Sequence, residues 1–339
     1  MRYRAISAQE GLLVSELGIG GNIFGYVCDK RQSKEILNAA RDYGVNFVDT
    51  ADVYSDGRSE EMIGEALTGE RAQWIIASKV GVRSNETGKG SGSRKVIFSR
   101  IEDSLRRLRT DYIDIYQLHH FDPLTPVQET LDAMTELRNQ GKIRYFGLSN
   151  LSVQQVALYL KEAQFSNLML PATNQIHYNI LKRNVVENFS IAALNSKPSL
   201  LVYGVLGRGI LSSKYCFGEM PERDSRANIS LSVRSDLQPV VLEAVEHLSQ
   251  ISLNAGITMS QLALAYALRS SEVASALVGM RSVEQLVEIA NTFVHDLPPD
   301  FWGSVDQYLV DLGNLEQVSL GRPLLHPQNE GTSIESEVR

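Results

Sequence analysis

Cysteine is scarce in this sequence. Its 339 residues include only Cys28 and Cys216, which lie far apart and outside any CxxC or metal-ligand spacing. This scarcity argues against a disulfide framework and against a cysteine-based metal site. A chain of this length can bury a large core without such cross-links. We therefore expect a reduced, cytoplasmic protein without a structural metal.

Long apolar runs and long basic runs are also missing. No stretch approaches the roughly 20 apolar residues that cross a bilayer, and residues 1–18 lack the apolar segment of a secretory signal. The formal net charge is −7, which argues against binding to nucleic acid or to an anionic membrane. No repeat or linker divides the chain, and nothing in the sequence indicates its oligomeric state.

Short β-rich runs alternate with amphipathic helical patterns through most of the chain. Most runs are apolar and β-branched rather than strictly alternating, as parallel strands covered on both faces are. The candidate strands are 15–21, 46–51, 74–80, 112–120, 145–150, 171–176, 199–205 and 275–281. Helical patterns fit 34–43, 95–109, 126–140, 152–163, 184–195, 239–254, 259–269 and 282–293. Eight strands with intervening helices predict an α/β protein with a (β/α)₈ TIM barrel.

The two ends of the chain differ from this alternation. The opening MRYRAI…GLLVSEL predicts a short hairpin before the first barrel strand. Together with the barrel it forms one predicted domain over residues 1–318. Residues 319–339 are mostly polar, and we expect a loosely ordered tail there.

Polar side chains gather at the carboxyl ends of the candidate strands, where barrels of this type carry their chemistry. Each has an ordinary explanation when taken alone, such as a loop cap, a solvated lysine or a histidine that bonds to backbone. Seven consecutive strands with such ends indicate a functional rim. The residues are Asp49, Lys79, His119, His120, Ser149, Asn150, Asn174, Gln175, Tyr203, Gly279 and Arg281.

The stretch NFVDTADVYSDGRSEE, residues 46–61, places Tyr54 five residues after Asp49. A phenol with a pKa near 10 is a poor acid at neutral pH. A neighbouring Lys79 ammonium would lower that pKa, since such a pair about 4 Å apart gains up to roughly 4 kcal/mol at an effective dielectric near 20, before desolvation. Asp49 would hold Lys79, and a histidine would donate to a carbonyl oxygen. This set suits carbonyl reduction once hydride is supplied.

The sequence resembles the aldo-keto reductase family. DTADVYSDGRSEEMIGEAL, IIASKV, YIDIYQLHHFDPLTP, GKIRYFGLSN, NQIHYN, YGVLGRGILSSKY and GMRSVEQLVE follow one another in the family's order, over roughly residues 3–312. The resemblance implies a barrel that binds a nicotinamide cofactor, usually NADPH, without a Rossmann fold. No GxGxxG loop occurs where a Rossmann unit would require it.

The resemblance also implies catalytic roles. Tyr54 is the general acid, and Lys79, held by Asp49, lowers its pKa. His119 orients the substrate carbonyl. His120 stands where the family often has Trp and is assigned to the substrate pocket. The alternative that His120 is the catalytic histidine stays open.

The same resemblance implies the residues that bind the cofactor. Ser149, Asn150 and Gln175 hold the nicotinamide carboxamide, and Tyr203 stacks on its ring. The segment 204–209 meets the pyrophosphate. The remaining cofactor residues are Asp49, Gly21, Asn22, Gly204, Leu206, Gly209, Lys214 and Gly279, with Arg281 and Gln285 at the adenosine 2′-phosphate and Glu288 at the adenine.

Two positions depart from the family pattern. The family's Tyr-Ser-Pro-Leu is Tyr-Gly-Val-Leu at 203–206, so a hydroxyl contact to the pyrophosphate is lost. The family's Glu-Asn pair near the adenine is Glu288-Ile289, which weakens adenine recognition. NADPH is favoured because Arg281 is retained, since a guanidinium suits an anion; NADH stays open as an alternative.

The substrate pocket is expected in the loops at 22–30, which includes Phe24, at 81–94 and at 215–236. A glycine- and serine-rich loop at 81–94, with His120, favours a polar carbonyl such as a sugar or a keto-sugar on a nucleotide. An aliphatic or aromatic aldehyde remains an alternative. Two other functions stay open: a cofactor-binding regulatory protein resembling potassium-channel β subunits, and a lyase or isomerase on the same barrel.

Overall fold

The computed structural model describes residues 1–6, 11–81, 91–212, 237–293 and 297–313. They belong to two compact units, one made of residues 1–205 and 260–297 and the other of 206–259 and 298–339. The first unit contains all the described strands. The predicted single domain over 1–318 stays a prediction, and the tail at 319–339 lies outside the described residues.

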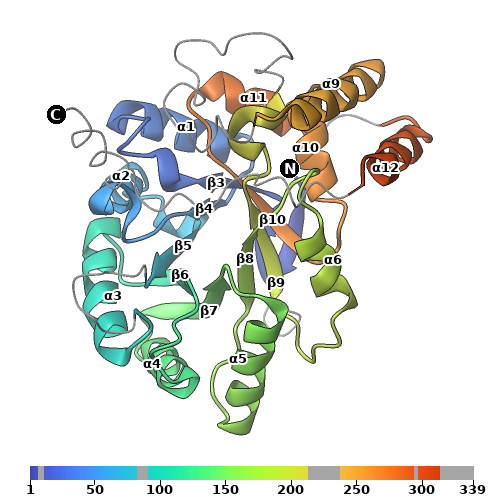
Figure 1. Cartoon of the computed structure of the whole chain (residues 1–339). Coiled ribbons are helices and arrows are strands. Elements are labelled where there is room, and N and C mark those ends of the chain that lie inside the picture. The colour runs from blue at the N-terminus through green and yellow to red at the C-terminus, as the bar shows by residue number, and fades with distance from the viewer. Residues whose placement is uncertain (7–10, 82–90, 213–236, 294–296, 314–339) are drawn as a thin grey trace, which may run out of the picture. The chain divides into compact units, whose positions relative to one another are not determined.

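Eight parallel strands form a closed barrel in the order β10-β3-β4-β5-β6-β7-β8-β9, which confirms the predicted fold (Figure 1). They are β3 (Leu17–Gly20), β4 (Phe47–Asp49), β5 (Ile75–Val80), β6 (Ile113–Leu118), β7 (Ile143–Ser149), β8 (Thr173–His177), β9 (Ser199–Tyr203) and β10 (Val273–Val278). The ring closes where β10 pairs with β3, with Ala276 opposite Leu17. Strands β5 and β6 are buried along their whole length, as is typical of parallel strands covered on both faces.

Helices follow most of the strands. In the first unit they are α1 (Lys30–Asp42), α2 (Arg58–Ala66), α3 (Arg94–Leu108), α4 (Val127–Asn139), α5 (Val153–Phe165), α6 (Asn184–Ile191) and α11 (Val283–Ala290). The second unit contains α9 (Pro239–Asn254) and α12 (Phe301–Leu312). The first residue of α10 (Met259–Ala267) belongs to the second unit, and the rest of that helix belongs to the first unit. Figure 1 shows α1 to α5 outside the strands.

Local signals explain where several helices begin. Asp29 caps α1 in a reciprocal capping box with Gln32, so this helix starts four residues before the predicted 34–43 pattern. The helices α2 and α12 were not among the predicted ones. α2 packs so closely on α3 that a Cβ at Gly64 would lie 2.5 Å from the Arg107 carbonyl oxygen. A small residue there, rather than an apolar stripe, permits the contact.

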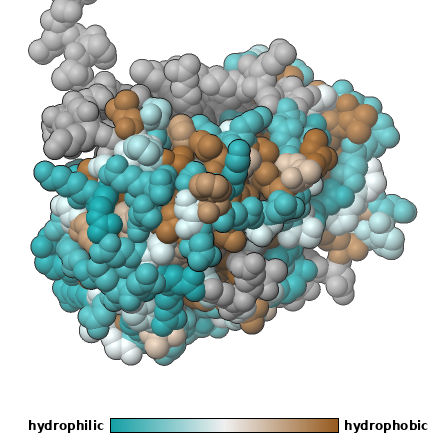
Figure 2. All heavy atoms as spheres, turned by 90° about the horizontal axis from the view of Figure 1, so that it is seen from below, coloured by the Kyte–Doolittle hydropathy of each residue, from teal (hydrophilic) through white to brown (hydrophobic). Residues whose placement is uncertain are grey.

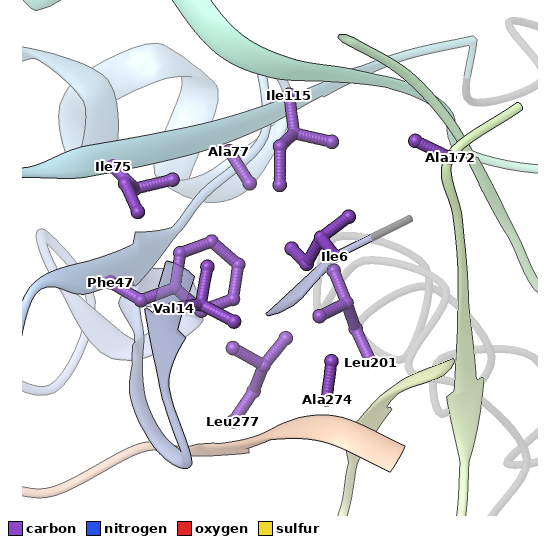
Figure 3. Packing of buried hydrophobic residues seen from close by; sticks show 10 residues of the cluster. All are labelled: Ile6, Val14, Phe47, Ile75, Ala77, Ile115, Ala172, Leu201, Ala274 and Leu277. Carbon is purple, nitrogen blue, oxygen red and sulfur yellow. The ribbon is translucent and has the colours of Figure 1, made fainter. Parts of the chain in front are cut away.

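The predicted N-terminal hairpin is present as β1 (Tyr3–Ile6) paired antiparallel with β2 (Leu12–Ser15). Ile6 and Val14 are fully buried and pack with Phe47, Ile115 and other barrel residues in one hydrophobic cluster (Figure 3). Burying such a side chain contributes about 1.5–3 kcal/mol. The hairpin therefore completes the core of the barrel away from the strand ends that carry polar groups.

The molecular surface carries both hydrophilic and hydrophobic side chains, as is typical of amphipathic helices. The face in Figure 2 is mostly hydrophilic, with hydrophobic side chains gathered in patches between the polar ones. Among the described residues, no helix combines the length and the apolar character that crossing a bilayer requires.

Candidate active site

The amine of Lys79 is the centre of the predicted catalytic set. Its Nζ lies 2.5 Å from Asp49 Oδ2 and donates hydrogen bonds to Thr50 O at 2.8 Å and to Tyr54 Oη at 3.1 Å. Lys79 is fully buried and Asp49 is 3% exposed, whereas Tyr54 is half-buried. The structure thus brings the predicted carboxylate, ammonium and phenol into one chain of contacts.

Short local segments place these three groups. Asp49 is the last residue of β4, and Lys79 lies near the end of the adjacent β5. Tyr54 begins a 3₁₀ turn in which Ser55 and Asp56 both have φ near +55°, a region that costs a non-glycine residue energy. The Ser55 hydroxyl donates to the Phe24 carbonyl at 2.8 Å and anchors this turn to the loop after β3.

Two buried amides hold the second oxygen of Asp49. Gln117 Nε2 and Gln175 Nε2 donate to Asp49 Oδ1 at 3.0 and 2.7 Å, and Gln175 Nε2 also lies 3.3 Å from Gln117 Oε1. Gly147 of β7 leaves room for the Gln117 side chain, because a Cβ there would lie 2.7 Å from Gln117 Cγ. The predicted set does not include Gln117, because Gln117 lies inside β6 and not at a strand end. A polar residue within an apolar strand was the available signal.

Burial and charge oppose each other at the phenol. Burial raises the pKa of Tyr54 above its usual value, Lys79 lowers it, and Asp49 and Asp52 add to the rise. The net effect of all these groups is a raised pKa of Tyr54, so the predicted net lowering is wrong. The effect of Lys79 taken alone has the predicted sign. Burial lowers the pKa of Lys79, but Asp49 and Tyr54 raise it more. A protonated phenol therefore lies beside a charged ammonium at neutral pH.

The two histidines after β6 form a stacked pair. Their rings are parallel within 2° and 4.9 Å apart. His119 is 8% exposed, and its ring lies edge-on to the Tyr54 ring at 5.9 Å between centroids. His120 is partly exposed, and burial together with Lys79 lowers its pKa. Contact with Tyr54 favours His119 over His120 as the group that orients a carbonyl.

The predicted nicotinamide residues are connected to one another. Asn150 Nδ2 donates to His119 O at 3.1 Å and lies 3.1 Å from Ser149 Oγ, while Asn150 Oδ1 accepts from Tyr203 Oη at 2.8 Å. Ser149 is 1% exposed, whereas Tyr203 is half-buried. Asn174, by contrast, donates to Leu151 O at 3.0 Å and serves the backbone of the next loop.

A glycine is required directly after Tyr203. Gly204 has φ +70°, and a Cβ there would lie 2.2 Å from the His177 ring. We expect Gly204→Ala to lower the free energy of unfolding by about 1–3 kcal/mol, because it combines backbone strain with overpacking. Urea unfolding measures this effect. Gly207→Ala is the control, since its φ is also positive but its Cβ would meet nothing closer than 3.4 Å. Equal losses in the two variants would contradict the clash.

Other predicted cofactor residues lie on the rim of the first unit. A Cβ on Gly21 would meet Asp49 O at 2.9 Å, and a Cβ on Gly279 would meet Asn22 Oδ1 at 3.2 Å. The loops after β3 and β10 are therefore adjacent there. Phe24 does not fit its predicted place in a substrate pocket, because its side chain is fully buried and offers no surface to a ligand.

The loop from β10 to α11 carries the predicted 2′-phosphate residues. Ser282 caps α11, and the Gln285 side chain accepts the backbone N–H of Arg281 at 2.8 Å. The Gln285 amide oxygen thus shapes the loop. Arg281 and Glu288 are partly exposed. Arg281 is two residues before Val283, the first residue of α11.

The remaining predicted residues belong to the second unit or are not described. Leu206 and Gly209 lie in the second unit, where the Gly209 N–H donates to Leu206 O at 2.8 Å. Gly207, Arg208 and Gly209 all have positive φ, so this turn depends on two glycines. Lys214 and most of the predicted pocket loops, 82–90 and 215–236, lie outside the described residues.

Comparison with known sequences shows similarity along almost the whole chain. A family model described as "Aldo/keto reductase family" matches residues 16–310. A "Probable voltage-gated potassium channel subunit beta" of Oryza sativa subsp. japonica is 33% identical over 299 residues, which covers 85% of this chain and 90% of the relative. "Aldo-keto reductase YhdN" of Bacillus subtilis (strain 168) is 33% identical over 296 residues, with coverage of 84% and 87%.

Solved structures are similar too. The holo form of aldo-keto reductase AKR11C1 from Bacillus halodurans matches with a TM-score of 0.73 and 30% identity, covering 93% of this chain and 97% of that one. Glycerol dehydrogenase AKR11B4 from Gluconobacter oxydans matches with a TM-score of 0.76 and 26% identity, covering 96% and 98%.

Proposed function

Since the chain belongs to the aldo-keto reductase family and is an oxidoreductase acting on carbonyl or alcohol groups, we propose that it reduces an aldehyde or ketone with NADPH, and that Tyr54 donates the proton. The observation that carries this proposal is the position of Lys79 Nζ, within hydrogen-bonding distance of both Asp49 and Tyr54. His119 lies beside the phenol. A substrate carbonyl held there would face an acid and a hydrogen-bond donor.

Proton donation needs a phenol that is still protonated, and the raised pKa of Tyr54 maintains that state at neutral pH. When the phenol gives up its proton, the Lys79 ammonium at 3.1 Å stabilises the phenolate. Asp49 keeps Lys79 charged and in place. A positioned acid of this kind typically contributes about 10²–10⁴-fold to a rate.

The residues of the rim fit a nicotinamide cofactor. Tyr203 is half-buried and its hydroxyl is bonded to Asn150, so the orientation of its ring is set before any ligand arrives. Ser149 and Gln175 supply polar groups at the same rim, next to the Asp49 carboxylate. When bound, the cofactor supplies the hydride. We assign the pyrophosphate to Gly204 and, as predictions from the sequence, to Leu206, Gly209 and Lys214.

The preference for NADPH is expected to depend on Arg281. Arg281→Ala should weaken NADPH binding by about 10- to 100-fold, because a hydrogen-bonded charge pair contributes about 1.5–3 kcal/mol. NADH binding should change little, since NADH lacks the 2′-phosphate. Isothermal titration with each cofactor measures both constants. Arg281→Lys, which keeps the charge but not the planar fork, should give an intermediate loss. Equal losses for NADPH and NADH would contradict the assignment.

The substrate is proposed to be a polar carbonyl such as a sugar or keto-sugar. His120 is partly exposed, and its lowered pKa keeps the imidazole neutral, so it can donate or accept a hydrogen bond from a hydroxyl. The structurally similar protein from Gluconobacter oxydans is named for a polyol, glycerol, which agrees with this chemistry. An aliphatic or aromatic aldehyde is the competing substrate class.

A cofactor-binding regulatory role is the second candidate function, favoured by the similarity to plant proteins named as potassium channel β subunits. Oxidation of NADPH and of NADH against a panel of sugars, keto-sugars and aldehydes separates the two. Turnover on a polar carbonyl supports the proposed reductase. Tight NADPH binding with no turnover on any carbonyl refutes it and supports the regulatory role.

A further inference from the structure

A second buried carboxyl lies in the loop that joins Asp49 to Tyr54. Asp52, three residues after Asp49, has a side chain that is only 3% exposed. Its backbone N–H donates to the carbonyl oxygen of Lys79 at 3.2 Å. Its Oδ1 is buried and has no hydrogen-bond partner among the described residues. A carboxylate in such a place is costly when charged.

The neighbours of Asp52 compensate its charge only in part. From α3, Arg100 Nε lies 3.9 Å from Asp52 Oδ2, and the Arg100 side chain is half exposed. Arg107, also on α3, is bound to the fully buried Glu60 of α2 at 2.7 Å. From β6, the Tyr116 hydroxyl is buried without a partner in the part of the chain that the structure describes. Burial and Glu60 raise the pKa of Asp52, whereas Arg100 and Arg107 lower it, and the net result is a pKa of about 7.

The charge of Asp52 acts on Tyr54. Asp52 precedes Tyr54 by two positions in the same loop, and its backbone N–H is bonded to the carbonyl oxygen of Lys79, the residue whose amine contacts the phenol. Burial raises the pKa of Tyr54 most, and the Asp49 and Asp52 carboxylates add to that rise. Resting on the proposed reductase function, we propose that Asp52 is a positioning residue: the protonation state of its carboxyl decides whether a negative charge lies near the Tyr54–Lys79 pair. Protonated Asp52 favours proton donation by Tyr54, and ionised Asp52 opposes it, because a negative charge destabilises the phenolate that remains.

The expected result is a pH-dependent rate. Reduction by the unaltered protein falls about three- to tenfold as the pH rises through about 7, because one negative charge appears near the phenol. Asp52→Asn, which stays neutral, removes this decline and keeps the faster rate above pH 7. Arg100→Gln moves the midpoint of the decline to higher pH, because Arg100 favours the ionised form. Asp56→Asn is the matched control, an exposed aspartate in the same loop, and leaves the profile unchanged.

Nuclear magnetic resonance of the full chain gives a readout that needs no turnover. The ¹³C-carboxyl signal of Asp52, identified by its loss in Asp52→Asn, titrates near neutral pH. The ¹³Cζ signal of Tyr54, identified by its loss in Tyr54→Phe, follows the same titration, and does not do so in Asp52→Asn. The pKa of Asp52 is higher in the folded state than in the unfolded state, so ionised Asp52 lowers native stability as the pH rises towards 7. Asp52→Asn removes that charge and is therefore expected to fold. Urea unfolding at about pH 8 checks this.

The outcomes are separable. An unchanged pH profile in Asp52→Asn, with turnover intact, overturns the inference. If no carbonyl is reduced by any form of the protein, the proposed function fails, and the resonance measurement alone decides the inference. A Tyr54 signal that ignores the Asp52 titration then overturns it, and one that follows it upholds the coupling.

Discussion

Replacing Tyr54 with Phe should lower kcat for carbonyl reduction by about 10²- to 10⁴-fold, the usual contribution of a positioned acid. The substitution removes one hydroxyl and keeps the ring that packs edge-on against His119. It also leaves the Lys79 amine with two of its three hydrogen-bond acceptors, Asp49 and Thr50. NADPH binding should therefore be retained. Steady-state kinetics on the best carbonyl of the panel, with NADPH titrated by fluorescence, measures both quantities.

The control for this variant is Tyr26→Phe. Tyr26 is 58% exposed and lies in the loop after β3, so losing its hydroxyl tests whether any tyrosine near the rim has the same effect. It should keep kcat within about twofold, since surface substitutions usually have small effects. A Tyr54→Phe variant with unaltered kcat would show that another group donates the proton.

Replacing Lys79 with Met should abolish most activity and also destabilise the fold. The variant lacks the ammonium that stabilises the phenolate. Among the described residues, it leaves Asp49, 3% exposed, with the amide donors of Gln117 and Gln175 alone. Breaking a buried ion pair on one side costs about 3–5 kcal/mol. The free energy of unfolding from urea titration and kcat on the same carbonyl measure the two effects.

The pH dependence of this pair has a definite sign. The folded state raises the pKa of Lys79, so the pair's stabilisation is fully present below the ordinary lysine pKa and is lost as the pH rises through the higher folded value. The stability gap between the natural chain and Lys79→Met should therefore shrink in strongly alkaline solution.

A double variant separates the structural role of Lys79 from its chemical role. Lys79→Met with Asp49→Asn removes both charges, so the uncompensated buried carboxylate disappears and part of the lost stability should return. Activity should not return, because the phenolate still lacks its cation. If the single Lys79→Met variant keeps natural stability and kcat, Lys79 does not hold the site together.

Particular residues show how far the sequence could predict the site. Asp49, Tyr54 and Lys79 could be chosen because parallel strands of a barrel deliver their ends to one rim, and the three groups do meet. Gln117 could not be chosen in this way because it reaches Asp49 from inside β6 and not from a strand end. The place of Phe24 was misjudged because loop residues carry no periodicity that separates a buried ring from an exposed one.

The direction of the Tyr54 pKa shows a different limit. A pairwise argument from the sequence had the sign of the Lys79 effect right, but burial and two carboxylates outweigh it. Desolvation depends on every atom that surrounds the phenol, and no sequence pattern encodes that environment. The missed helix α2 has a related cause, since it is specified by the close contact of Gly64 with α3 more than by an apolar stripe.

By itself, the sequence determined the parallel barrel, the N-terminal hairpin and the family to which the chain belongs, because strand and helix periodicity and ordered motifs are local properties of the chain. Only the tertiary structure decided which side chains contact Asp49. It also decided that the Tyr54 phenol stays protonated and that the Asp52 carboxyl is buried. These features depend on distances and on exclusion of water among residues far apart in the chain, and both arise only when the barrel closes.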